Sequence, residues 1–403
     1  MMRFGRFTQR GGDAVEAQIR NVVVEGGEIA RSILPPGSFR CLVLMGGYGR
    51  GEGGVEVTGG QERPHNNLDF LLVTTGPWKR RTEELRKSLG EALRPLAERA
   101  GIGIDVGATS DAALLRAPCR VMWYDVRFGH QTILGDQGFL PSLGRFTADR
   151  ILSDDIRDLL VNRGTLLVIN DAVAALPTPD PAAWKALVRH AVKAILGYGD
   201  ALLYWRGAYH WSYAERQRRM AARDDVGEDF RKLYDAAMEF RFRPDYAEWE
   251  GRDLKAWLGG IRKAVEPVHL DVEGLRCGMR GQGWKAYPAA ALSKGLADGL
   301  RSPREAARRA KALLRSRGSL SSAGFGLAPS LLPMRDLLGI VFPVIAYDLA
   351  EPEFRTLARA VVGGAEDPEG LRLAFLRAWG VHGDPNFEAA ARKLGIELRG
   401  GRA

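Results

Sequence analysis

The chain has 403 residues, 45% of them hydrophobic and 27% charged, which is typical of a globular protein with two or three domains. It carries 58 Lys and Arg against 49 Asp and Glu, and the net charge of +9 favours nucleotides, nucleic acid or other polyanions as partners without distinguishing among them. The three cysteines are odd in number and widely spaced, which predicts neither a disulfide framework nor a zinc site.

The apolar runs are too short for a membrane span. The longest, from Leu337 to Tyr347, is interrupted by Gly339 and Pro343, whereas a spanning helix needs about 20 apolar residues. No sustained apolar segment follows the first methionine, so we expect no secretory signal. Together these observations predict a cytoplasmic protein with no membrane span.

The first 141 residues alternate between helical and extended patterns. The expected elements, in chain order, are a helix over 13–32, strands over 38–46 and 67–74, a helix over 82–100, and strands over 101–107 and 120–134. A glycine-rich turn is expected between the first two strands. This order predicts a small mixed sheet that contains all four strands, with helices beside it.

From about residue 142 the strand signals almost vanish and helical periodicity continues. Helices are expected over 151–173, 181–207, 213–222, 230–242, 302–317, 336–349, 352–362, 367–379 and 386–394. The predicted fold class is therefore α+β, with an N-terminal domain over 1–141 and all-helical domains over 142–290 and 291–403. The basic face of helix 302–317 suits RNA, acidic lipid or an acidic partner, and a solvated face is the alternative.

The most informative segment joins the first two strands. The apolar run Leu42–Met45 leads into Gly46-Gly47-Tyr48-Gly49-Arg50-Gly51, and Asn67 and Asp69 open the next strand. Glycines after a strand let backbone N–H groups approach an anion. Residues two apart in a strand share a face, so Asn67 and Asp69 should point together. A phosphate-binding segment facing oxygen ligands suits metal-dependent phosphoryl or nucleotidyl transfer.

A third polar position follows on the strand over 101–107. Its apolar residues alternate with Gly103 and Asp105, which should therefore share the other face, with open space beside Asp105. Asp105 could simply end the strand and cap a turn. Its place after Asp69, with one helix between them, favours a role beside that carboxylate.

These residues resemble the DNA polymerase β-type nucleotidyltransferase superfamily over about residues 38–136. The pattern of that family is an apolar strand, Gly-Gly or Gly-Ser, a spacer, and then Asp-x-Asp or Asp-x-Glu at the start of the next strand. The glycine segment is especially similar to bacterial uridylyltransferases and minimal nucleotidyltransferases. The resemblance implies a nucleoside triphosphate such as ATP as substrate, Mg²⁺ or Mn²⁺ as cofactor, and a helical domain over 142–290 that closes the nucleotide cleft.

The resemblance also implies roles for individual residues. The expected nucleotide-binding residues are Gly46, Gly47, Tyr48, Gly49 and Arg50, the expected catalytic residues are Asp69 and Asp105, and the expected metal ligands are Asn67, Asp69 and Asp105. Asn67 stands where the family has its first carboxylate. An amide oxygen carries no charge and Mg²⁺ prefers anionic oxygens, so nucleotide binding is better supported than catalysis.

A basic residue of the helical region is a further candidate. Lys193, with Tyr209, Ser212 and Tyr213, could contact the triphosphate or the base, as such groups do in the family. The alternative is a lysine on a helix face beside aromatic core residues.

Three functions are compatible with the sequence. The leading hypothesis is a Mg²⁺-dependent nucleotidyltransferase that modifies a protein, a small molecule or an RNA, and no motif identifies the acceptor. The alternative is a nucleotide-binding regulatory or scaffold protein with a degenerate site. A toxin–antitoxin-like nucleotidyltransferase is a third, although the adjacent Arg189 and His190 lack the spacing of the ribonuclease that accompanies some minimal nucleotidyltransferases.

Overall fold

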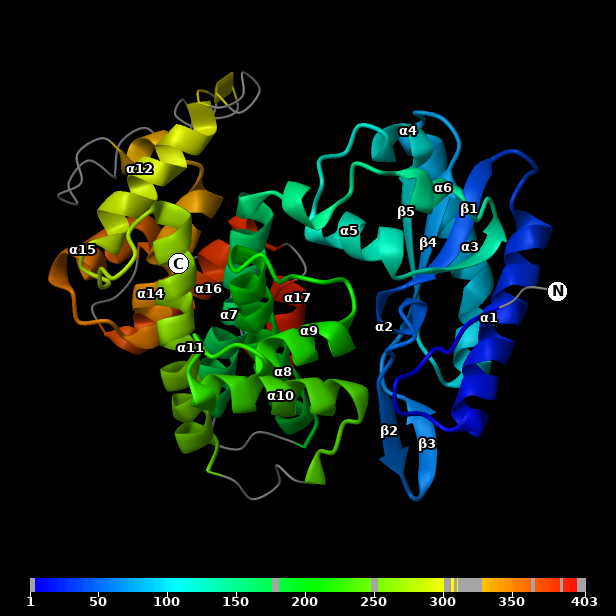
Figure 1. Cartoon of the computed structure of the whole chain (residues 1–403), viewed down its shortest axis with the longest axis horizontal. Coiled ribbons are helices and arrows are strands. Elements are labelled where there is room, and N and C mark those ends of the chain that lie inside the picture. Colours follow the sequence, from blue (N-terminus) through cyan, green and yellow to red (C-terminus); the bar gives the residue numbers. More distant parts are fainter. Residues whose placement is uncertain are drawn as a thin grey trace, which may run out of the picture. The chain divides into compact units, whose positions relative to one another are not determined.

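The computed structural model of the chain describes residues 4–175, 181–247, 253–300, 306–307, 310, 328–363, 367–384 and 387–396. The fold is α+β, as the sequence predicts, with a small mixed sheet near the N-terminus and mostly helices after it (Figure 1). The chain divides into two compact units. Unit 1 comprises Met1–Asp155, Gly207–Asp225 and Asp235–Glu248, and unit 2 comprises Ile156–Arg206, Val226–Tyr234 and Trp249–Ala403.

Unit 1 is built on a four-stranded sheet with the strand order β5-β4-β1-β6. Its strands are β1 (Phe39–Met45), β4 (Leu68–Thr74), β5 (Ile104–Ser110) and β6 (Gln131–Gly135). Strand β1 is antiparallel to both β4 and β6, whereas β4 and β5 are parallel. The expected strands thus lie in one sheet, which confirms the prediction for this part of the chain.

Two long helices bury one face of this sheet. Their bounds are α1 (Asp13–Ile33) and α3 (Lys79–Ala100). One apolar cluster joins the two helices to the strands, and its members include Val15, Ile19, Val23, Leu42, Leu44, Phe70, Leu72, Leu89 and Leu93. Alternation along β1 and β4 sends every second side chain into this cluster, which leaves the residues between them on the other face.

The segment over 120–128, predicted to be extended, is a helix instead. It forms α5 (Val121–Phe128), and only the end of the predicted strand, β6, is extended. Its β-branched and aromatic residues favour a strand locally, but Asp125 of α5 binds the buried guanidinium groups of Arg50 and Arg216. These tertiary contacts outweigh the weak local preference. Three short elements complete this region, α4 (Asp111–Leu114), α6 (Phe139–Ser142) and η1 (Ala148–Arg150).

The glycine-rich segment differs from the expected turn. It begins as one helical turn, α2 (Gly46–Gly49), and continues into a hairpin of β2 (Val55–Thr58) and β3 (Gln61–Pro64) that was not predicted. Gly59 and Gly60 join the two hairpin strands with φ of +59° and +77°. A Gly-Gly pair between alternating residues is a hairpin signal, so the sequence did contain the cue.

After residue 150 the described residues contain helices and no strand, as predicted. The helices are α7 (Ser153–Ala174), α8 (Pro181–Trp205), α9 (Tyr213–Ala221), α10 (Glu228–Phe242), α11 (Leu254–Cys277), α12 (Tyr287–Leu300), η3 (Pro329–Leu331), α14 (Met334–Tyr347), α15 (Pro352–Val362), α16 (Pro368–His382) and α17 (Phe387–Lys393). The expected basic helix over 302–317 lies almost wholly outside the described residues.

The longest apolar run of the sequence is a core helix of unit 2. Within α14, every residue from Leu337 to Ala346 is buried. An apolar stretch of this length suits the centre of a helical domain. Among the described helices, none has the length and apolar character needed to cross a membrane.

Candidate functional site

Asp69 and Asp105 lie side by side where β4 and β5 begin. They are register partners in the parallel ladder between the two strands. Leu68 and Phe70, which flank Asp69, are fully buried, whereas Asp69 is only partly buried and Asp105 is exposed. The two carboxylate-bearing residues therefore share the face opposite the apolar core, which confirms their predicted juxtaposition.

Gly46 begins the glycine-rich segment directly beside Asp69. Met45, the residue before it, pairs with Asp69 in the ladder between β1 and β4. Gly46 has a φ of +69°, and a Cβ at this position would overlap the Oδ2 atom of Asp69. Glycine tolerates this backbone conformation and leaves space at the carboxylate. The first glycine of the motif is therefore required by both the turn and the site.

Asn67 directs its side-chain amide toward Asp105. Its Nδ2 atom lies 2.9 Å from Oδ2 of Asp105, and a carboxylate only accepts hydrogen bonds, so the amide donates. The rest of the amide lies over Gly103, where a Cβ would overlap it. The space expected beside Asp105 is thus filled by Asn67, which is a correction to the sequence prediction.

The side chains at this edge offer a magnesium ion few oxygen ligands. The carboxylate of Asp69, whose Oδ2 atom lies where a Cβ of Gly46 would be, is a ligand of the kind that Mg²⁺ prefers. The group of Asn67 that faces Asp105 is an N–H donor, whereas Mg²⁺ needs oxygen lone pairs. Within the described part of the chain, no three His, Cys, Asp or Glu side chains are grouped to hold a metal.

The glycine-rich segment is held in place by contacts of Tyr48, Gly49 and Arg50 with other parts of the protein. The Tyr48 hydroxyl donates to a backbone carbonyl at 2.8 Å, and burial raises the pKa of Tyr48 to about 12. A Cβ on Gly49 would overlap the carbonyl oxygen of Leu44. The side chain of Arg50 is only 9% exposed and pairs with Asp125 at 2.9 Å. In this arrangement all three residues contact protein groups.

A buried polar cluster surrounds Asp125. Its carboxylate lies 2.9 Å from Nη2 of Arg50 and 3.0 Å from Nη2 of Arg216, and it accepts a hydrogen bond from the hydroxyl of Tyr209 at 3.1 Å. Tyr209 is 4% exposed. This tyrosine is therefore part of the core of unit 1, in agreement with the structural alternative considered for it.

Glu52, the residue after Gly51, caps helix α9. Its carboxylate accepts hydrogen bonds from Oγ of Ser212 at 2.5 Å and from the backbone N–H groups of Tyr213 and Ala214 at 2.8 and 3.1 Å. A carboxylate at a helix N-terminus satisfies donors that have no partner within the helix. Sequence reasoning assigned no role to Glu52, and Ser212, considered there as a nucleotide contact, is the N-cap residue of α9.

Arg241 of α10 is the cation beside the glycines. Its Nη2 atom lies 3.2 Å from the position that a Cβ of Gly47 would take, and its Cζ atom lies 3.9 Å from the ring centroid of Tyr213. Its Nε atom is buried and has no hydrogen-bond partner among the described residues. Arg241 was missed because an arginine in a helix carries no sequence signal for this position.

Two other candidates lie elsewhere. Lys193 is exposed on α8 of unit 2, and its contact with a nucleotide stays a prediction. His65, which directly precedes Asn66 and Asn67, lies between Glu56 and Tyr246, with its ring nitrogens 3.2 and 3.3 Å from their oxygens. It joins the hairpin to the segment that follows α10.

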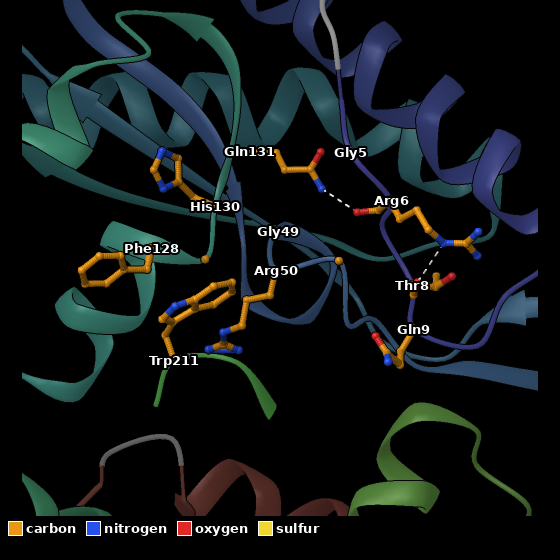
Figure 2. Close-up of a pocket in the computed structure, with 12 residues that line it drawn as sticks. Gly5, Arg6, Thr8, Gln9, Gly49, Arg50, Phe128, His130, Gln131 and Trp211 are labelled. Carbon is orange, nitrogen blue, oxygen red and sulfur yellow. Dashed lines mark hydrogen bonds between the residues drawn. The ribbon is translucent and has the colours of Figure 1, made fainter. Parts of the chain in front are cut away.

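A pocket of about 430 Å³ opens in unit 1 beside the end of the glycine segment (Figure 2). Its lining comprises residues 5–6, 8–9, 49–51 and 128–131 together with Trp211. Figure 2 shows the Gln131 amide directed at the backbone of Arg6, to which its Nε2 donates at 2.9 Å. Neither Asp69 nor Asp105 lines this pocket, so it is distinct from the carboxylate pair.

The chain matches no known protein family, and no curated protein is significantly similar to it. Any functional assignment therefore depends on the residues and geometry described above.

Proposed function

We propose that unit 1 binds a nucleoside triphosphate with one magnesium ion and transfers its nucleotidyl group to a hydroxyl-bearing acceptor. The observation that carries the proposal is the pairing of Asp69 with Asp105 directly beside Gly46. Two carboxylates next to a glycine-rich backbone suit a polyphosphate and its cation.

Arg241 supports the same proposal from the other side of the glycines. A guanidinium forms strong, oriented hydrogen bonds with phosphate oxygens. The position of Nη2 beside Gly47 would place this donor near a triphosphate bound along the segment. The nucleotide cleft that the resemblance implies would then have Tyr213 of α9 and Arg241 of α10 along one side.

Each carboxylate would have its own part in the transfer. Asp69 would hold the magnesium ion, which when bound neutralises phosphate charge and polarises the reacting phosphoryl group. Asp105 would accept the proton of the acceptor hydroxyl. A bond then forms between the acceptor oxygen and the α-phosphorus, the bond from that phosphorus to the bridging oxygen breaks, and pyrophosphate leaves.

A nucleotide-binding regulatory protein is the second candidate, and Asn67 favours it. Its amide donates to the carboxylate that would accept the proton and adds no negative charge for a metal. Such a site could retain the nucleotide without turning it over.

The experiment that tests the proposal is incubation with each labelled nucleoside triphosphate and Mg²⁺ or Mn²⁺. Pyrophosphate release and transfer of label to the protein, to added small molecules with hydroxyl groups, or to RNA ends support the enzyme. Saturable nucleotide binding without release supports the regulatory protein. Absence of binding for every nucleotide would exclude both functions.

A further inference from the structure

The side-chain amide of Asn67 donates a hydrogen bond to the carboxylate of Asp105. We infer that this amide takes the place of a second cation at Asp105, so that the site holds a single divalent ion, at Asp69. This inference rests on the proposed nucleotide site. Within that site, the carboxylate of Asp105 accepts a hydrogen bond from a neutral amide and does not bind a metal ion.

Two contacts, one with Asp105 and one with Gly103, determine the orientation of the Asn67 amide. Asn67 precedes β4 by one residue, and Asp69, two positions later, is the register partner of Asp105. The 2.9 Å contact with Asp105 requires the NH₂ group to face the carboxylate. The missing side chain of Gly103 gives the amide its room, because a Cβ there would overlap its atoms.

The charges lead to the same conclusion. Asn67, Asp69 and Asp105 together carry two negative charges, and the contact between Asn67 and Asp105 is attractive as it stands. A carboxylate at position 67 would instead bring two like charges to hydrogen-bond distance, an arrangement that a bound cation stabilises. Mg²⁺ and Mn²⁺ bind more tightly as carboxylate ligands are added. Asn67→Asp should therefore create a cation site that the natural sequence lacks.

The test is a titration of nucleotide-free protein with Mn²⁺, with free Mn²⁺ followed by electron paramagnetic resonance. The Asn67→Asp variant should bind one more Mn²⁺ ion than the natural protein. The affinity for this added ion should be at least about tenfold higher than the affinity of the natural protein for any Mn²⁺ ion at Asp105. Asn66→Asp is the matched control, since it adds the same charge one residue away, where the side chain lies near Gly54. It should not gain the ion.

Two further variants make the result specific. Adding Asp105→Asn to Asn67→Asp should remove the gained ion, and this loss would show that both positions contribute to it. Asn67→Ala in the natural background should leave Mn²⁺ affinity unchanged, because the amide is a donor and not a ligand. Unchanged Mn²⁺ stoichiometry in Asn67→Asp, or weaker Mn²⁺ binding in Asn67→Ala, would overturn the inference.

The titration separates this inference from the proposed function because it needs no nucleotide. A gained Mn²⁺ ion in a protein that binds no nucleoside triphosphate would leave the inference standing and exclude the function. If a nucleotide does bind, the natural protein should retain one Mn²⁺ per nucleotide and the Asn67→Asp variant two. Two Mn²⁺ ions per nucleotide in the natural protein would overturn the inference alone.

Discussion

The guanidinium of Arg241 lies over the ring of Tyr213, and its Nη2 atom lies beside Gly47. Its Cζ atom is 3.9 Å from the ring centroid, and Arg50 and Arg216 approach the same ring at 4.8 and 4.6 Å. Asp125 forms ion pairs with both Arg50 and Arg216. Three guanidinium groups therefore approach the Tyr213 ring, and that of Arg241 also lies beside the glycine segment.

Arg241→Ala should weaken the binding of a nucleoside triphosphate by about ten- to a hundredfold, because a charge-assisted phosphate contact contributes roughly 1.5–3 kcal/mol. Calorimetric titration with the nucleotide and Mg²⁺ measures the change. Arg243→Ala is the control, since its exposed side chain pairs with Glu62 at 3.6 Å. Equal nucleotide affinities of the Arg241→Ala and Arg243→Ala variants would show that Arg241 does not contact the nucleotide.

The two carboxylates should differ in what they do. Asp69→Ala should abolish Mg²⁺-dependent nucleotide binding, because Asn67 has no charge with which to replace it. Asp105→Ala should spare binding and suppress transfer, because its expected contact is with the acceptor hydroxyl. Calorimetry and pyrophosphate release measure the two effects. Undiminished affinity in the Asp69 variant would mean that the nucleotide does not use this carboxylate.

Glu52→Ala should destabilise helix α9 by about 1–2 kcal/mol, since it removes the acceptor of three hydrogen bonds at the helix N-terminus. Hydrogen exchange of the amides of Tyr213 and Ala214 measures the loss directly. Glu83→Ala, which breaks an exposed pair with Arg86 on α3, should leave both amides unchanged. If these two amides exchange as slowly in the Glu52→Ala variant as in the natural protein, α9 does not depend on this cap.

Asp125→Asn should destabilise unit 1 by about 3–5 kcal/mol, because it leaves Arg50 and Arg216 buried without a counter-charge. Thermal unfolding measured by calorimetry should show a lower midpoint for one transition. Asp225→Asn disrupts an ion pair with Arg223 in which the Asp225 side chain is 43% exposed, and it should cost less than about 1 kcal/mol. Similar midpoints for the two variants would contradict the role of the cluster.

Unit 2 should lose stability as the pH falls from about 6.5 toward 4. Burial lowers the pKa of His269 to about 4, with Arg276 and Arg157 acting in the same direction and Glu273 opposing them. The unfolded chain binds this proton below its ordinary pKa of 6.5 and the folded chain does not, so lower pH favours unfolding. Between pH 6.5 and 5 the cost is about 2 kcal/mol.

Calorimetric unfolding of the natural protein and of His269→Phe at a series of pH values tests this expectation. Phenylalanine suits the aromatic surroundings of His269, whose ring centroid lies 5.5 Å from those of Trp284 and Phe342. The variant should show a smaller fall in its midpoint on acidification, whatever its stability at neutral pH. Equal pH dependence in the two proteins would assign the effect to other groups.

Local pattern was sufficient for most of the elements near the carboxylates. The alternation that separates Leu68 and Phe70 from Asp69 placed one set in the core and the other on the open face. A period of two residues follows from strand geometry alone, so the sequence predicts it without tertiary information. The same reasoning, with one connecting helix, was sufficient to expect Asp105 beside Asp69.

Contacts between distant segments decided the rest. The segment of α5 is a helix although its residues favour a strand, because Asp125 there binds Arg50 and Arg216. Arg241 reaches Gly47 across almost two hundred positions of sequence, and no local pattern encodes such a contact. The capping of α9 by Glu52 is of the same kind.

The sequence by itself determined that an asparagine stands at position 67, two residues before Asp69. Only the tertiary structure decided what that asparagine does, because the direction of its amide depends on Asp105 and Gly103 of a different strand. Periodicity fixes which face a side chain takes, since that is a property of the local backbone. Hydrogen-bond partners are fixed by the packing of strands and helices that are far apart in the chain.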